Sequence, residues 1–132
     1  MRRLPGDPPS PYEDRIGFSR VVAAAGHVFV GGTTSVTPDG FVVGETPYEQ
    51  TVEIMRKLAH ELVRGGAAIP DVVLARIYVT DISRSDEVGR ALGETFGDIR
   101  PVMTMVEVSG LIDPRMLVEI EAVAILNPAG AR

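Results

Sequence analysis

The chain contains no cysteine, one lysine and two histidines among its 132 residues. The absence of cysteine excludes disulfide bonds, thiol nucleophiles and thiolate-bound metal or iron–sulfur sites. No apolar run approaches the roughly 20 residues that a membrane-spanning helix needs. The first residues are rich in proline, whereas a secretory leader would have an apolar segment there. The lack of a leader and of a membrane span favours a cytoplasmic protein.

Charge and size narrow the function classes further. Thirteen basic and eighteen acidic side chains give a formal net charge of −5. This balance gives no electrostatic help to binding nucleic acid or an anionic membrane, so it disfavours both as partners. The length suits one domain with one modest core.

The proline-rich start predicts an extended arm over residues 1–15, followed by a single domain over 16–127 and a tail over 128–132. The clearest local signal in the domain is Thr46-Pro47-Tyr48-Glu49, a capping box with proline at the first helical position. Apolar residues then recur at helical spacing until Gly65-Gly66, where we expect the helix to end.

The other expected elements follow from alternation and turn signals. The Ala25-Gly26 pair predicts a tight turn between two strands. A second helix is expected from Ser83 to Gly97, and its interior Gly89 and Gly93 indicate close packing on a neighbour. The expected strands are 19–24, 27–33, 72–79, 102–108 and 116–126.

This β-β-α-β-α-β-β order predicts an α+β fold, a mixed sheet with both helices on one face, because strand–helix–strand crossovers are right-handed. In the last strand Val118 and every second residue after it are apolar, which suits the face toward the helices. Glu119 and Glu121 then lie on the opposite face. No element remains to cover that face, so we expect self-association through it.

Few residues offer obvious chemistry. Neither His27 nor His60 has a partner at metal-ligand spacing, so both are interpreted as structural or surface residues. Schiff-base chemistry would require Lys57, which we expect to be solvated on an amphipathic helix.

The carboxylates near the end of the chain are more informative. Regular strands would place Met103, Met105 and Glu107 on one face of their strand, and Glu119 and Glu121 on one face of theirs. These acids either form a solvated rim or line a cleft between subunits, where one orients a water or pairs with an arginine. Periodicity alone leaves both interpretations open.

Four segments together resemble the RidA (YjgF) superfamily, also known as L-PSP endoribonuclease-like proteins, over about residues 17–126. They are Gly17-Phe18-Ser19, Val28-Phe29-Val30-Gly31-Gly32-Thr33, Pro101-Val102-Met103-Thr104-Met105-Val106-Glu107-Val108 and Val118-Glu119-Ile120-Glu121-Ala122. The resemblance implies a chorismate-mutase-like fold and a homotrimer with ligand clefts between subunits. It also implies hydrolysis of enamine or imine intermediates to 2-keto acids and ammonia, without a metal or cofactor.

The sequence departs from the family pattern at one decisive position. In the deaminase subgroup, an arginine two residues after the strand proline binds the substrate carboxylate, a role that suits its bidentate geometry. This sequence has Met103 there, so it resembles a subgroup that lacks the deaminase arginine. Phe18 replaces the family tyrosine, and Thr33 stands where a glutamine often follows.

Other family positions are kept. Glu119 matches the glutamate that positions water, and Gly32 matches the glycine whose backbone faces the ligand. Arg100 either supplies a shifted positive charge or forms a surface or interface pair. The candidate catalytic residues are Glu119 and Thr104, and the candidate binding residues are Phe18, Gly32, Thr33, Arg100, Met103 and Glu107.

Three functional hypotheses follow. The first is a homotrimer that binds a small metabolite between subunits, with any chemistry hydrolytic or tautomeric on imine or enamine compounds. The second is a non-catalytic trimer that senses a ligand or binds a partner through the same cleft. The third is an endoribonuclease, which the acidic, histidine-poor composition disfavours.

Overall fold

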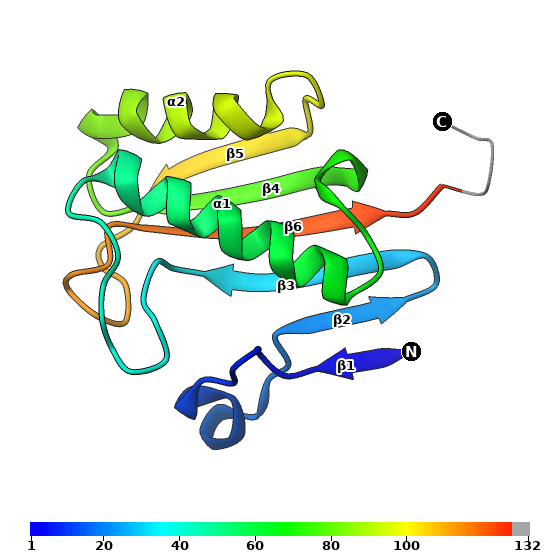
Figure 1. Cartoon of the computed structure of the whole chain (residues 1–132). Helices are drawn as coiled ribbons and strands as arrows, with labels where there is room; N and C mark the ends of the chain where they lie inside the picture. Colours follow the sequence, from blue (N-terminus) through cyan, green and yellow to red (C-terminus); the bar gives the residue numbers. More distant parts are fainter. Residues whose placement is uncertain (128–132) are drawn as a thin grey trace.

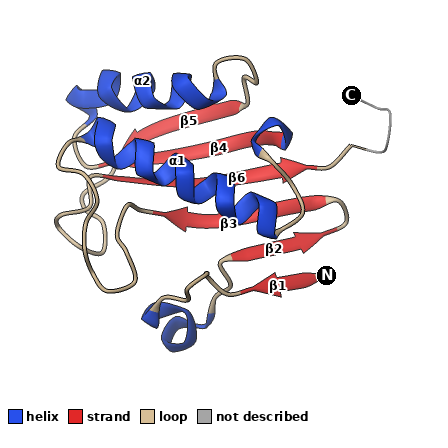
Figure 2. Cartoon of the chain, viewed as in Figure 1, coloured by secondary structure: helices blue, strands red, loops and turns tan. Residues whose placement is uncertain are grey.

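The computed structural model is a six-stranded mixed sheet with α1 and α2 lying across one face (Figure 1). It describes residues 1–127, so the tail expected over 128–132 lies outside the described residues. The strands are β1 (Arg2–Leu4), β2 (Val21–Ala24), β3 (His27–Thr33), β4 (Val72–Val79), β5 (Val102–Glu107) and β6 (Val118–Ile125). The helices are α1 (Pro47–Arg64) and α2 (Ser85–Phe96), with short helical turns at Glu13–Gly17, Ile69–Asp71 and Ile82–Arg84 (Figure 2).

The strand order across the sheet is β1-β2-β3-β6-β4-β5. Only the pairing of β4 with β5 is parallel among the described strands; the other neighbours are antiparallel. The predicted α+β fold with both helices on one face is therefore confirmed. No helix within residues 1–127 is both long enough and apolar enough to cross a membrane.

Helix α1 forms for the local reasons that the sequence indicates. The Thr46 Oγ1 accepts a hydrogen bond from the Glu49 backbone N–H at 3.1 Å, and the Glu49 carboxylate accepts one from the Thr46 N–H at 3.2 Å. This capping box satisfies N–H groups that the first turn leaves free. The fully buried face of α1 carries Ile54, Leu58 and Leu62, which pack on the sheet.

The β2–β3 hairpin turns where predicted. Ala25 and Gly26 have φ values of 50° and 76°, the left-handed conformation that two-residue hairpin turns require at both positions. In β6, Val118 and Ile120 are fully buried beneath the helices, so the predicted alternation of that strand is confirmed.

The N-terminal segment contains structure that the sequence pattern does not reveal. Residues Arg2–Leu4 pair antiparallel with Val21–Ala23 of β2 and add a first strand to the predicted element order. A strand of three residues is too short to show a period. Glu13, in the following helical turn, is buried and accepts hydrogen bonds from the Gly6 and Ser10 backbone N–H groups at 2.8 and 2.6 Å.

Three glycines test the packing of the helices. A Cβ added at Gly65 would lie 2.5 Å from Val28 Cγ1 and 3.0 Å from Val21 Cγ1, so the end of α1 approaches β2 and β3 too closely for a side chain. By contrast, a Cβ at Gly89 or Gly93 would meet nothing within 4 Å in the described chain. The close packing expected at these two positions is therefore absent from the subunit.

We expect Gly65→Ala to destabilise the protein by about 1–3 kcal/mol, because it overpacks the core. Gly89→Ala serves as the matched control and should stabilise it by up to about 1 kcal/mol, because alanine is the better helix former. Urea unfolding of both variants measures the difference. Equal midpoints would contradict the close approach at Gly65.

Candidate functional site

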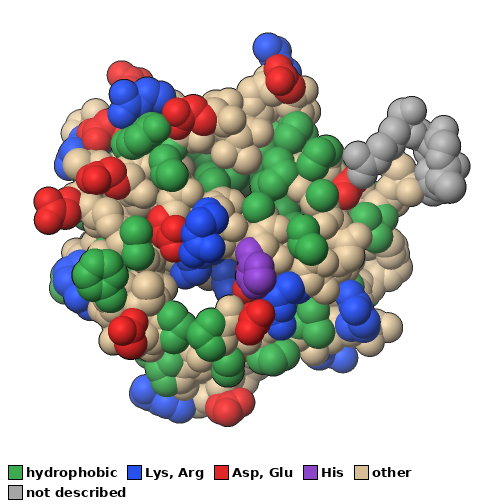
Figure 3. All heavy atoms as spheres, in the orientation of Figure 1, with side chains coloured by type: hydrophobic (Ala, Val, Ile, Leu, Met, Phe, Trp, Pro, Cys, Tyr) green, Lys and Arg blue, Asp and Glu red, His purple; other side chains and the backbone are tan. Residues whose placement is uncertain are grey.

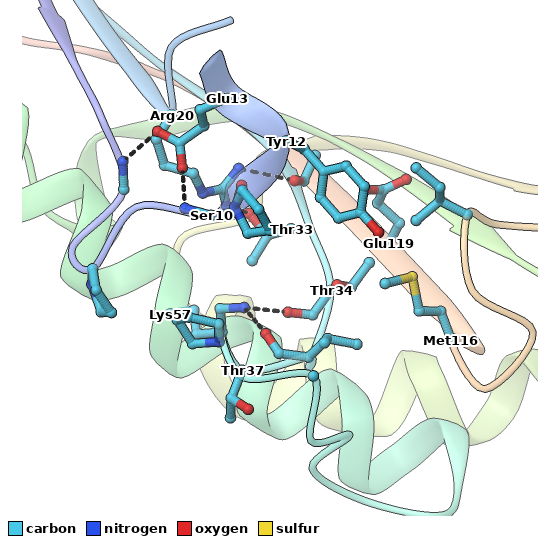
Figure 4. Close-up of a pocket in the computed structure, with 18 of the residues that line it drawn as sticks. Ser10, Tyr12, Glu13, Arg20, Thr33, Thr34, Thr37, Lys57, Met116 and Glu119 are labelled. Carbon is cyan, nitrogen blue, oxygen red and sulfur yellow. Dashed lines mark hydrogen bonds between the residues drawn. The ribbon is translucent and has the colours of Figure 1, made fainter. Parts of the chain in front are cut away.

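A cavity of about 900 Å³ lies between the N-terminal segment, the end of β3, α1 and the loop before β6 (Figure 4). Phe18, Gly32, Thr33 and Glu119 line it, so four of the eight predicted site residues come together in one subunit. Viewed from the side of the helices, the molecule has an opening edged by basic, acidic and histidine side chains (Figure 3).

The cavity wall is shaped by a β-bulge in β3. The pairing of β3 with β6 shifts register between Val30 and Thr33. Arg20 spans the irregularity: its Nη1 donates to the carbonyls of Gly31 and Gly32 at 3.0 and 2.8 Å, and its Nη2 donates to Thr33 Oγ1. Burial lowers the pKa of this guanidinium. Arg20 therefore stabilises the backbone carbonyls that the bulge turns away from the ladder.

Glu119 lies directly against the bulge. A Cβ added at Gly32 would stand 2.8 Å from Glu119 Oε2, so the carboxylate occupies space that only glycine leaves free. Burial raises the pKa of Glu119, with a further raising effect from Glu121, while Arg20 opposes it. Within residues 1–127 no hydrogen bond or ion pair reaches this carboxylate. It is a half-buried acid able to accept hydrogen bonds from a ligand or to exchange a proton.

Glu121 differs from Glu119 in having partners. The Tyr78 hydroxyl donates to Glu121, and Arg76 Nη1 lies 3.9 Å from its Oε1. The two acids therefore differ in their surroundings. Glu121 pairs with an arginine on the sheet face, whereas Glu119 faces the cavity.

Lys57 is not the solvated lysine that its position on α1 suggested. Its side chain is half-buried and donates to the carbonyls of Thr34 and Val36 at 2.6 and 3.0 Å. Burial lowers the pKa of its amine. The lysine holds the chain that leaves β3, a role that helical periodicity could not indicate.

The two histidines have no metal-binding arrangement. His60 Nε2 lies 3.5 Å from Asp7 Oδ2 at the surface, and His27 stacks on Phe29. Within the described part of the chain, no group of three or more histidine, aspartate or glutamate side chains could hold a metal ion.

The other four predicted residues lie elsewhere. Arg100, Met103, Thr104 and Glu107 belong to β5 or precede it, at the sheet edge opposite the N-terminal strand, and none lines the cavity. Met103 is in register with Ala75, whose row lies under the helices, so it lies on the face opposite Glu119. Thr104 is on the open face, in register with Arg76.

Two of these four residues have partners near β5. Glu107 accepts a hydrogen bond from the Ile82 N–H at 3.0 Å. Arg100 Nε donates to the Gly97 carbonyl at 3.4 Å. A single subunit therefore does not unite the β5 residues with Glu119.

Tyr12, Glu13 and Arg20 were not predicted as site residues and Lys57 was expected to be solvated, yet all four line the cavity. The one signal for Arg20 is a charged residue at the start of an otherwise apolar hairpin that leads to Gly31-Gly32. The others carry no signal, because their placement depends on contacts between distant segments.

Removal of the Glu119 charge should stabilise the protein. Since burial raises the pKa of Glu119, the folded state keeps this proton to a higher pH than the unfolded chain. The stability contributed by this group therefore falls as pH rises from its ordinary pKa of 4.5 toward the raised value. We expect Glu119→Gln to melt at a higher temperature than the wild type at pH 7, with the difference vanishing below pH 4.5.

Calorimetry across this pH range measures the effect, with Glu45→Gln as the matched control. Glu45 is exposed and its side chain makes no bond within residues 1–127. A pH-independent difference for Glu119→Gln would contradict the predicted titration.

Arg20 offers a second test. We expect Arg20→Met to lose about 1–3 kcal/mol of stability, because it removes the charged donor that the Gly31 and Gly32 carbonyls and Thr33 share. Arg56→Met, at an exposed residue of α1 paired with Glu53, should change stability by less than about 0.5 kcal/mol. Chemical denaturation distinguishes them, and equal losses would refute the structural role of Arg20.

Comparison with known proteins places this geometry in a family. The family model described as "Endoribonuclease L-PSP" matches residues 12–126. A member of the YjgF/YER057c/UK114 family from Mycobacterium tuberculosis has a similar crystal structure, with a TM-score of 0.85 and 42% identity over 95% of this chain and 98% of that one. A putative endoribonuclease from Thermotoga maritima gives a TM-score of 0.84 and 29% identity over 97% of this chain and 100% of that one.

Curated sequences agree with this assignment. A RutC family protein from Pyrococcus abyssi is 30% identical over 109 residues, covering 81% of this chain and 84% of the relative. An uncharacterized protein from Streptomyces coelicolor is 38% identical over 115 residues, covering 87% of this chain and 86% of the relative. The chain therefore belongs to the RidA (YjgF)/L-PSP superfamily.

Proposed function

We propose that this protein is a homotrimer that binds a small imine- or enamine-type metabolite in a cleft between subunits and hydrolyses it with Glu119. The observation that carries the proposal is the unpartnered, half-buried Glu119 carboxylate, which lies against Gly32 in a cavity of about 900 Å³. Its raised pKa suits a group that both accepts and donates a proton.

The hydrolysis needs only water and one acid–base residue. Glu119 orients a water molecule and accepts its proton as the oxygen attacks the carbon of the protonated C=N bond, which leaves a neutral carbinolamine. The protonated Glu119 then donates this proton to the carbinolamine nitrogen. As the C–N bond breaks, the hydroxyl proton passes to Glu119 and from there to the released ammonia. The products are a carbonyl compound and ammonium, and Glu119 ends as the carboxylate.

The trimer supplies the second side of the cleft in this proposal. The sheet face away from the helices exposes Phe29, Val102 and Val106. Such an apolar face favours self-association. A neighbouring subunit would then bring its β5, with Arg100, Met103, Thr104 and Glu107, toward the cavity.

A non-catalytic ligand-binding trimer is the second candidate, because Met103 is exposed on β5 where the deaminase subgroup has its arginine. A thioether cannot bind a carboxylate as a guanidinium does. Binding without turnover would satisfy every other feature of the cavity.

The test is an amine oxidase assay that follows decay of the imine released from benzylamine, which carries no carboxylate, in a sample confirmed as a trimer by mass. We expect the protein to accelerate the decay over the spontaneous rate. Glu119→Gln should lower kcat at least about 100-fold, because it removes the acid–base group. Glu45→Gln should retain full activity. Equal activity of Glu119→Gln and wild type would remove Glu119 from the mechanism, and saturable binding without acceleration would support the non-catalytic candidate.

A further inference from the structure

We propose that the Glu119 cavity selects small ligands that present a cationic or neutral N–H donor and an apolar substituent, and that it rejects carboxylates. This inference rests on the ligand-binding part of the proposed function. Two observations support it: the charged side chains around the cavity, except Glu119, have partners within residues 1–127, and the rim of the cavity is apolar.

The two half-buried cations of the cavity already have hydrogen-bond partners within the chain. Arg20 donates to the Gly31 and Gly32 carbonyls and to Thr33, and Lys57 donates to two carbonyls of the chain that follows β3. Their positive charges therefore stabilise backbone carbonyls. A carboxylate ligand would have to share a cation whose charge already stabilises backbone carbonyls, which weakens its attraction to either group.

The exposed basic groups are matched as well. Each faces an acidic side chain of the same subunit, with the pairs Arg56–Glu53 at 2.7 Å, Arg115–Asp113 at 2.7 Å and His60–Asp7 at 3.5 Å. Among the cavity-lining residues, all of which lie in the described part of the chain, no basic side chain is left without a partner. The wall that one subunit supplies thus offers a carboxylate only cations that already have partners.

Glu119 has the opposite character. The buried acids nearby have donors within the chain: Glu13 accepts two backbone N–H groups, and Glu61 pairs with Arg64 at 2.6 Å. Glu119 has no such donor among residues 1–127. A ligand carboxylate beside it would suffer like-charge repulsion in a partly desolvated site, whereas an amidinium or iminium N–H would form a charge-assisted hydrogen bond.

The rim supplies the apolar half of the specificity. Tyr12, Ile16, Phe18 and Ile112 are exposed and line the cavity. Figure 4 shows Tyr12 and Met116 on the same side of the cavity as Glu119. An aromatic or branched substituent would bury these side chains, while a small polar ligand would leave them in water.

The test uses benzamidine, benzamide and benzoate, which share one shape and differ in charge. Calorimetric titration of the trimer at pH 8 should give the tightest binding for benzamidine, weaker binding for benzamide, and at least tenfold weaker binding for benzoate than for benzamidine. Acetamidine, which lacks the ring, should also bind at least tenfold more weakly than benzamidine.

Two variants test whether Glu119 is the residue responsible for the selectivity. Glu119→Gln should weaken benzamidine binding at least tenfold and leave benzamide binding nearly unchanged, whereas Glu45→Gln should alter neither. Thermal unfolding confirms that each variant is folded.

Three results would overturn the inference: benzoate binding as tightly as benzamidine, no binding of any probe, or benzamidine binding that survives Glu119→Gln. If benzoate binds and Arg100→Ala abolishes that binding, a neighbouring subunit supplies the anion site. The imine assay distinguishes failure of the proposed selectivity from failure of the proposed catalytic function. Benzoate preference with Glu119-dependent turnover overturns only the selectivity, whereas amidine selectivity without turnover upholds it and overturns the catalytic role.

Discussion

The clamp of Arg20 on the β3 bulge is the interaction on which the site depends. The Gly31 and Gly32 carbonyls lie where the sheet ladder is irregular, and the guanidinium of Arg20, just before β2, donates to both. The bulge in turn positions Gly32, whose missing side chain makes room for the Glu119 carboxylate. The partly buried guanidinium of Arg20 thus shapes the wall beside the half-buried carboxylate of Glu119.

Several charged side chains around the cavity form hydrogen bonds with the backbone of the same chain. Arg20 and Lys57 both stabilise backbone carbonyls on either side of Thr33, so the end of β3 is held from two directions. Glu13 serves the N-terminal segment in the complementary way, by accepting two backbone N–H groups. Glu119 alone among these groups is left facing the cavity without a partner in the described chain, which is why the proposed chemistry and selectivity both centre on it.

The sheet order explains why the predicted site residues separate into two sets. The cavity is bounded by β3, β6 and the N-terminal segment, whereas β5 forms the far edge of the sheet. Met103 and Glu119 also belong to opposite faces, because Met103 lies in the row of Ala75 and Glu119 in the row of Tyr78. Any site that uses both must combine two copies of the chain, which fits the proposed trimer.

Local chemistry made much of the fold predictable. The Thr46 capping box, the Ala25-Gly26 turn and the alternation of β6 act over a few residues, and the structure contains each of them. Glu119 and Gly32 were identified by resemblance, and their close contact in space was not visible in the sequence.

The sequence by itself determined the two main helices, the five strands that follow residue 18 and the buried face of β6, because capping, turn chemistry and periodicity depend on near neighbours. Four sequence segments identified the family by resemblance. Tertiary structure decided the pairing of β1, the partners of Arg20 and Lys57, and the isolation of Glu119. These depend on contacts between residues up to tens of positions apart, which no local pattern encodes. The physical reason is that buried donors and acceptors choose partners by distance in the folded chain, not by spacing along it.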